Sequence, residues 1–429
     1  MKLNYKRTFL VGLAFLSISS FWQMYDNVIP LILQNTFHLN ESLIGAIMAV
    51  DNVLAVFLLP IIGTLSDKVD TPLGKRTPFI IAGTAASVFF MMLLPFADAN
   101  RMLPLFVIAL ALTLISMAMY RSPAVALMPD LTPKPLRSKA NAVINLMGAI
   151  GGVYTLALIS LLVKKEQNPS YLPVFLGVAA IMITAVVLLV LTTKEKEIAA
   201  KIAAEYPDEE ETTVTSGKNA AQTGELPKEV KRSLIFILLS IFLWFTAYNA
   251  VTTAFSRYAV TVWKIEGGGY ANCLLIATVA AIISYIPIGS LSSKFGRKKM
   301  IMGGLILMLI SYTAAFFYTS YNATIIIFFA LIGMGWASVG VNSLPMVVEM
   351  SKGSDIGKYT GLYYTFSMTA QIFTPVISGL LLQYVSYKTL FPYSMFFVIC
   401  ALITMSQVKH GDSKPIQKKD MLENFDIED

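Results

Sequence analysis

Two aspartates stand inside long apolar runs near the start of the chain, where a charged side chain is unusual. Asp26 lies within the run 9–33 and Asp51 within the run 43–63. A carboxylate at the depth of a membrane core costs several kcal/mol, so residues of this kind are usually functional. A carboxyl group in a low dielectric tends to keep its proton, and a nearby cation or hydrogen-bond donor makes release possible. The residue types therefore indicate a site that loads and releases a small cation.

The residues themselves leave the identity of that cation open. Asp26 and Asp51 could carry protons, or they could coordinate sodium, a hard ion that prefers oxygen ligands, with Asn27 and Asn52 as neighbours. At 1.5 Å per residue both aspartates lie roughly 15 Å below one surface, close to mid-bilayer. Arg121 is the candidate countercharge. Its position in the chain places it about 13 Å deeper than the acids, and it could instead extend toward the nearer surface.

The elements that hold these residues are predicted to be membrane-spanning helices. The 429 residues are 56% hydrophobic and 14% charged, and their mean hydropathy is +0.66, which is typical of a polytopic membrane protein. Runs of roughly 20 apolar residues, the length that spans a bilayer, predict an all-α fold with twelve transmembrane helices. The runs are 9–33, 43–63, 78–96, 102–128, 140–163, 172–193, 233–262, 271–292, 300–319, 323–348, 359–385 and 389–407.

Lysine and arginine are divided unevenly between the loops at the two ends of these spans. Fifteen stand before the first span or after spans 2, 4, 8 and 10, whereas five stand in the opposite loops. The positive-inside rule then places both termini in the cytoplasm of a cell-membrane protein. The net charge of +7 reports this topology, so no nucleic-acid partner is expected. Both cysteines fall within spans, and no metal, disulfide or cofactor is predicted.

A polar segment divides the chain into two halves. Residues 194–232 are rich in charged residues and lack apolar periodicity, so they are predicted to be a cytoplasmic linker. The linker separates a six-helix bundle at 1–193 from a second at 233–407, and a cytoplasmic tail follows at 408–429. A single chain that contains both halves needs no partner subunit, so a monomer is expected.

The two halves repeat one another. A shift of 222 residues superposes Trp22 on Trp244 and Asn27 on Asn249. The same shift carries the sequence at 74–76 onto that at 296–298. Several matches in chain order at nearly constant offset indicate an internal duplication. Duplicated halves of this kind enclose a polar cavity near the midplane, and access alternates as the halves rock.

Two loop motifs carry a resemblance to a known family. Gly63-x-x-Ser-Asp67-Lys68, followed by Gly74-Lys75-Arg76-Thr-Pro78-Phe, resembles the 2–3 loop signature of the major facilitator superfamily in its sucrose-transporter-like form. The stretch 123–133, Pro-Ala-Val-Ala-Leu-Met-Pro-Asp-Leu-Thr-Pro, is similar to the fourth-helix motif of glycoside-cation symporters. The resemblance implies two pseudo-symmetric six-helix bundles and a cation-coupled sugar carrier, and its extended 2–3 loop favours protons over sodium.

The charged residues of these loops are predicted to form a cytoplasmic gate. An acid at the end of span 2 can lie near the positive end of a helix, and a basic cluster can pair with a carboxylate at the inner end of span 4 or 10. The alternative is a set of solvated surface pairs, each worth under about 1 kcal/mol. Arg257, near the outer end of its span, is interpreted as an interfacial charge. The predicted gate residues are Asp67, Lys75, Arg76, Asp130, Arg297 and Glu349.

Aromatic and amide side chains well inside the spans are typical of a sugar site. A sugar ring offers apolar C–H faces to indoles and hydroxyl groups to amides and carboxylates. The alternative is that these side chains hold helices together, at about 0.6 kcal/mol per hydrogen bond. The predicted substrate-binding residues are Trp22, Asn27, Asn145, Trp244, Asn249, Trp336, Asn342, Tyr364 and Gln371.

The predicted function is proton-coupled import of a disaccharide or other glycoside by alternating access. A sodium-coupled sugar symporter and an exporter or antiporter of amphipathic compounds are the alternatives within transporters. No His or Cys constellation near a membrane face supports an enzyme. The expected partners are thus a small solute, a coupling cation and the surrounding lipids.

Overall fold

Long apolar helices account for nearly all of the structure, a computed structural model that describes residues 3–133, 136–166, 169–205, 227–350 and 356–412. Twelve of the described helices are long and apolar enough to cross a membrane, which confirms the predicted all-α, twelve-span fold. They are α1 (Tyr5–Asn35), α2 (Glu41–Asp67), α3 (Thr77–Ala99), α4 (Leu103–Asp130), α5 (Arg137–Leu162), α6 (Leu172–Thr192), α8 (Lys228–Thr261), α9 (Tyr270–Phe295), α10 (Arg297–Phe317), α11 (Ile325–Val348), α12 (Ile356–Tyr384) and α13 (Leu390–Ser406).

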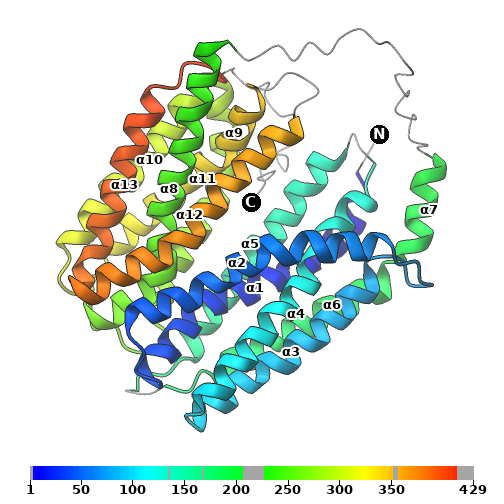
Figure 1. Ribbon diagram of the computed structural model, residues 1–429, viewed down its shortest axis with the longest axis horizontal. Coiled ribbons are helices and arrows are strands. Elements are labelled where there is room, and N and C mark those ends of the chain that lie inside the picture. Colours follow the sequence, from blue (N-terminus) through cyan, green and yellow to red (C-terminus); the bar gives the residue numbers. More distant parts are fainter. Residues whose placement is uncertain (1–2, 134–135, 167–168, 206–226, 351–355, 413–429) are drawn as a thin grey trace.

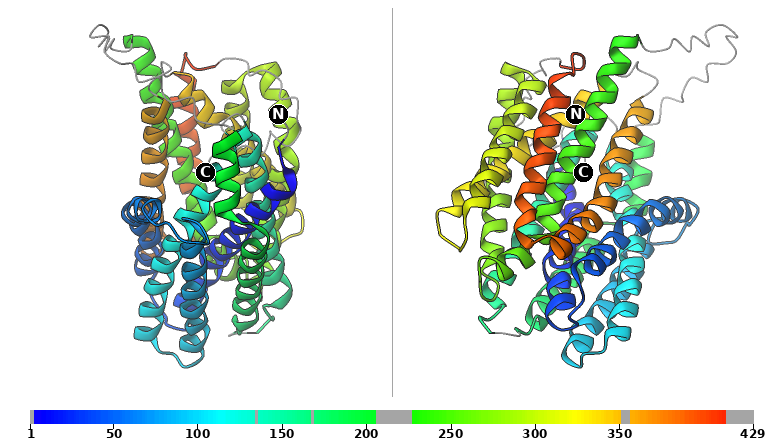
Figure 2. Two further views of the ribbon diagram at one scale, coloured as in Figure 1. Left: turned by 90° about the vertical axis from the view of Figure 1, so that its right-hand side faces the viewer. Right: turned by 60° about the vertical axis from the view of Figure 1, so that its left-hand side comes forward.

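The spanning helices form two bundles of six, α1–α6 and α8–α13. Figure 1 shows the bundles diverging toward the face where α7 (Glu195–Glu205) and the start of α8 lie, and converging at the other end. We call these the termini face and the opposite face. The halves meet through α2 against α12, α5 against α9, and α1 against α8. Figure 2 shows α2, in blue, leaning away from the lighter blue α3 and α4.

Local sequence explains where several helices begin. The side chains of Asn4 and Asn40 accept hydrogen bonds from the backbone N–H groups of Arg7 and Leu43, at 3.1 and 3.0 Å, and so cap α1 and α2. Proline stands in the first turn of α3, α4 and α6, where its missing N–H leaves no helical bond unmade. Side-chain caps or prolines thus mark the beginnings of α1, α2, α3, α4 and α6.

A carboxylate that follows the sixth span caps the start of α3. Glu195, the first residue of α7, is buried and accepts hydrogen bonds from the backbone N–H groups of Lys75, Arg76 and Thr77 at 2.7, 2.9 and 2.8 Å. The Thr77 hydroxyl donates a further bond at 2.7 Å. A negative group at a helix N-terminus satisfies unpaired donors and complements the helix dipole. The chain just after span 6 is thereby tied to the first half.

The second half repeats this arrangement. The Oδ1 atom of Asp412, beyond the end of α13, accepts a bond of 2.8 Å from the backbone N–H of Lys298 at the start of α10. Gly74 and Gly296 precede the two capped helices with φ angles of +112° and +92°, which L side chains rarely adopt. The beginnings of the predicted linker and tail therefore pack on the bundles. Residues 206–226 of that linker and 413–429 of that tail lie outside the described residues.

We expect Glu195→Ala to destabilise the first half by about 2 kcal/mol, because three backbone donors and a hydroxyl lose a buried acceptor. The thermal midpoint of the purified protein in detergent should fall by several degrees. Glu197→Ala, two residues along, is the matched control, since its exposed pair with Lys194 is worth little. Equal midpoints for the two variants would contradict the role given to Glu195.

Candidate functional site

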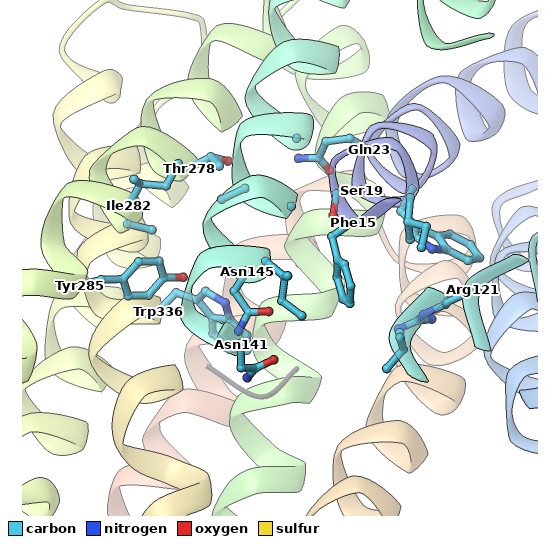
Figure 3. Close-up of a pocket in the computed structure, with 18 of the residues that line it drawn as sticks. Phe15, Ser19, Gln23, Arg121, Asn141, Asn145, Thr278, Ile282, Tyr285 and Trp336 are labelled. Carbon is cyan, nitrogen blue, oxygen red and sulfur yellow. The ribbon is translucent and has the colours of Figure 1, made fainter. Parts of the chain in front are cut away.

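A cavity of about 750 Å³ lies between the two halves, and its walls come from both. Figure 3 shows 18 of the side chains that line it. The lining comes from α1, α4 and α5 of the first half and from α8, α9, α11 and α12 of the second. The lining continues to Pro129 and Arg137, at the termini-face ends of α4 and α5. The cavity thus extends from mid-span to the termini face.

Hydrogen bonds between the halves lie beyond the other end of the cavity. Tyr270 donates through its hydroxyl to the backbone carbonyl of Asn27 at 3.1 Å, which joins α9 to α1. Ser160 of α5 donates to Oδ1 of Asn272 in α9 at 2.7 Å. These contacts hold the halves together at the opposite face.

Polar side chains of the first half face the cavity from α1 and α5. Ser19 and Gln23 are one helical turn apart on α1, and Asn141 and Asn145 are one turn apart on α5. Residues four apart share a helix face, so each pair points into the same space. The amides supply both donors and acceptors, which suits a solute with several hydroxyl groups.

Aromatic side chains dominate the wall from the second half. The rings of Tyr248 and Trp336 stack with centroids 3.7 Å apart and planes inclined by 4°. Both rings line the cavity, and Tyr285, Thr278 and Tyr364 add polar groups to the same wall. The cavity therefore has an amide-rich wall and a wall that combines stacked rings with hydroxyl groups.

Charge in the lining has a single sign. The charged residues among the described lining are Arg121 and Arg137, and no aspartate or glutamate lines the cavity there. The Cζ atom of Arg121 lies 5.8 Å from the centroid of the Trp22 ring, which is a cation–π distance. Arg121 thus points to mid-span and does not extend toward the termini face.

The two aspartates lie just outside the lining. Asp26 and Asp51 are half-buried on α1 and α2, and the Nδ2 atom of Asn52 donates to Oδ1 of Asp51 at 2.9 Å. Asp51 is within electrostatic range of both Asp26 and Arg121. Arg121 lies in the half of α4 nearer the termini face, but its long side chain brings the guanidinium within electrostatic range of Asp51. The Arg121 guanidinium therefore borders the cavity and acts electrostatically on Asp51.

The cavity brings together some of the predicted substrate residues and not others. Trp22, Asn145, Trp336 and Tyr364 line it. Five others lie outside the lining, and their binding role stays a prediction. Trp244 is fully buried, Gln371 is half-buried, and the side-chain N–H groups of the amides bond carbonyls one turn earlier in their own helices: Asn27 to Gln23, Asn249 to Phe245 and Asn342 to Ser338.

Sequence reasoning missed the lining residues of α9. Thr278, Ala281, Ile282 and Tyr285 all contact the cavity. Their spacing of three, four and seven residues marks one helix face. That spacing was available in the sequence, but none of these residues is charged, and none takes part in the matches between the halves. Polarity at helical spacing was the signal that could have found them.

The predicted gate residues form two clusters, one in each half. Arg76 is buried, and its guanidinium bonds Oδ2 of Asp130 at 2.8 Å and Oδ1 of Asp67 at 2.5 Å. Burial alone would lower the pKa of Arg76, but the bonds and charges of Asp130 and Asp67 outweigh it and raise the pKa above its ordinary value. Arg297 pairs with Glu349 in the second half.

Neither of these ion pairs crosses between the halves in this conformation. The cluster of the first half ties α2 and α4 to the start of α3, and that of the second half ties α10 to the end of α11. The Lys75 side chain is exposed. The gating role of all six residues stays a prediction.

Comparisons with known proteins bear on what the cavity holds. The family described as "MFS/sugar transport protein" matches residues 10–408. Two curated relatives, each an "MFS-type transporter ppzB", come from Metarhizium majus (28% identical over 104 residues, 24% of this chain) and Metarhizium rileyi (25% over 115 residues, 27% of this chain). The matched stretches cover about a quarter of those relatives, 23% and 24% of their lengths.

Solved structures share the fold at low sequence identity. The nucleoside transporter NupG (D323A mutant) has a TM-score of 0.68 at 13% identity and covers 94% of this chain and 100% of its own. The E. coli xylose transporter XylE, in an inward open conformation, has a TM-score of 0.67 at 14% identity, with coverage of 95% and 96%. A POT family transporter in complex with 5-aminolevulinic acid has a TM-score of 0.68 at 10% identity and covers 94% of each chain.

We expect Arg76→Gln to lower the thermal midpoint, because Asp67 and Asp130 lose the cation between them and repel one another. Adding Asp130→Asn to that variant should restore part of the loss, since it removes one of the two facing charges. Lys75→Gln is the control, because it removes a neighbouring positive charge that is exposed. An Arg76→Gln protein as stable as Lys75→Gln would exclude the cluster as a structural tie.

Proposed function

Since this chain belongs to the MFS/sugar transport protein family, we propose that it carries a glycoside across the membrane together with a cation. The family is one of transporters and not of enzymes, which agrees with the predicted class. The protein is a multi-pass membrane transporter of a small molecule. The glycoside, the cation and the direction of transport are the parts that we propose.

The composition of the cavity wall is the observation that carries the proposal. Amide groups of Gln23, Asn141 and Asn145 face stacked rings of Tyr248 and Trp336 across one space. Hydroxyl groups of a sugar pair with amides, and the apolar C–H face of the ring lies on an aromatic surface. A volume of about 750 Å³ is within the range of small-molecule sites and accommodates a disaccharide.

The charge of the lining favours neutral or acidic glycosides. Arg121 and Arg137 contribute positive charge without an acid in the described lining, so a cationic solute would meet repulsion. An exporter of amphipathic cations is therefore less well supported than a sugar carrier. Neutral amphipathic compounds remain as competitors in the test below.

Cation coupling in this proposal runs through Asp26, Asp51 and Arg121. When Asp51 is charged, it attracts Arg121; when a proton or sodium ion neutralises it, that attraction is lost. The Arg121 guanidinium, which lines the cavity, then turns to the solute. Loading of the cation and loading of the solute become interdependent through one side chain. Proton coupling is our first choice and sodium the alternative.

Alternating access assigns roles to the two faces. The proposal places both termini in the cytoplasm. The cavity, which reaches the termini face, then opens to the cytoplasm and releases an imported solute there. The clusters around Arg76 and Arg297 keep the helix ends of each half together, so that each half moves as one body. When the halves close at the termini face, these charged ends meet and form the predicted cytoplasmic gate.

Asn145→Ala should weaken solute binding about tenfold, which corresponds to about 1.4 kcal/mol for the lost hydrogen bonds. Asn100→Ala is the control, because its amide is exposed at the end of α3 and lies outside the lining. Titration of the purified protein with a glycoside panel, followed by tryptophan fluorescence, measures both. Equal losses in the two variants would remove the cavity as the binding site.

Asp51→Asn should abolish gradient-driven accumulation while counterflow of the same glycoside persists, because the variant has a permanently neutral side chain. Uptake into proteoliposomes with an imposed pH gradient, and separately a sodium gradient, measures this and names the cation. Asp70→Asn, an exposed acid of the 2–3 loop paired with Lys196, should behave as wild type. Accumulation that survives in Asp51→Asn would refute the coupling role.

A further inference from the structure

An ion pair buried at the opposite face joins the two halves. The Nε atom of Arg257 on α8 donates to Oε2 of Glu41, the first residue of α2, at 2.8 Å. The side chains are only 3% and 6% exposed. Arg257 is therefore not the interfacial charge expected from the sequence. A buried pair of this kind loses much when one partner is removed, because the other charge stays behind without compensation.

Further polar groups hold the Glu41 carboxylate from other directions. The Tyr387 hydroxyl, in the short helix η2 (Tyr387–Thr389), donates to Oε1 of Glu41. The Nε2 atom of Gln34 on α1 lies 3.2 Å from the same oxygen and 2.5 Å from the Tyr387 hydroxyl. Arg257 is itself fixed by a bond of 3.0 Å from one terminal nitrogen to the Thr253 carbonyl. Two helices of the first half are thus tied to two elements of the second.

The surrounding contact between the halves is tight. A Cβ atom added at Gly45, one turn after Glu41 on α2, would collide with the backbone carbonyl of Pro375 on α12. Close packing of this sort excludes water, and exclusion of water strengthens an ion pair. The Glu41–Arg257 pair therefore stabilises the closed arrangement of α2 against α8 and α12.

We propose that the Glu41–Arg257 ion pair keeps the opposite face closed, and that separation of the two side chains opens the cavity to that face. The inference rests on the proposed transport cycle, since only a carrier needs to open both faces in turn. It assigns to Glu41 and Arg257 a role that the cavity residues do not have. They set the balance between the two open states without touching the solute.

The test uses thiol labelling of single-cysteine proteins in detergent, in a background with Cys273→Ser and Cys400→Ser. Ser160→Cys reports on the opposite face, where Ser160 bonds Asn272 across the halves. Val125→Cys reports on the termini-face side, because Val125 lines the main cavity and is 47% exposed. The double variant Glu41→Gln, Arg257→Gln removes both charges together, so no uncompensated charge is left to prevent folding.

The double variant should raise the maleimide labelling rate at Ser160→Cys by about tenfold and lower the rate at Val125→Cys, as a shift between two states requires. Arg101→Gln, which removes an exposed positive charge from the loop between α3 and α4 at the same face, should leave both rates within about twofold of wild type. Arg257→Lys, which keeps the charge, should lie between the two.

Unchanged labelling rates at both positions in a monodisperse double variant would contradict the proposed role of the Glu41–Arg257 pair. A rise at both positions would also overturn it, because it would indicate loosening of the bundle and not movement between states. Labelling needs no solute, so it separates this inference from the proposed function. If the labelling rates shift as expected while proteoliposomes take up no glycoside, the role of the Glu41–Arg257 pair is supported and the assignment of the solute fails.

Discussion

Charge in an apolar medium must be paired, hydrated or neutralised, and this constraint governs the buried ionisable groups that the structure describes. Arg76 is enclosed by two carboxylates at the termini face, and Arg257 meets Glu41 at the opposite face. Between them, at mid-depth, Asp51 is within electrostatic range of Asp26 and of Arg121. Each of these groups would destabilise the bundle if its partner moved away without water or a cation taking its place.

The two halves contribute different groups to the region between them. Acids at mid-depth belong to the first half, on α1 and α2, whereas the stacked rings of Tyr248 and Trp336 belong to the second. In the proposed mechanism, a solute held between the halves contacts an aromatic surface on one side and, through Arg121, the proposed cation site on the other. Coupling in the proposed mechanism requires no long pathway, because one guanidinium borders both sites.

Polar contacts fasten the chain that follows each bundle to that bundle. Glu195 and Asp412 come from beyond the last span of their halves, yet Glu195 accepts backbone N–H bonds at the start of α3 and Asp412 accepts one at the start of α10. The chain segments that leave the bundles are in this way fastened to them at the termini face. A rigid half suits a carrier whose two faces open alternately, since movement is then confined to the contacts between halves.

Sequence by itself determined the twelve spans, the duplication and the loop motifs, because apolar length and repeated spacing are properties of the chain that need no knowledge of its partners. The motif residues Asp67, Arg76 and Asp130 are indeed neighbours. Tertiary structure alone decided which amides face the cavity: Asn145 lines it and Asn249 does not, since the rotation of a helix about its axis depends on the helices packed against it. It also decided that Arg257 meets Glu41 from 216 residues away, a pairing that no local pattern encodes because it exists only when the two halves close on one another.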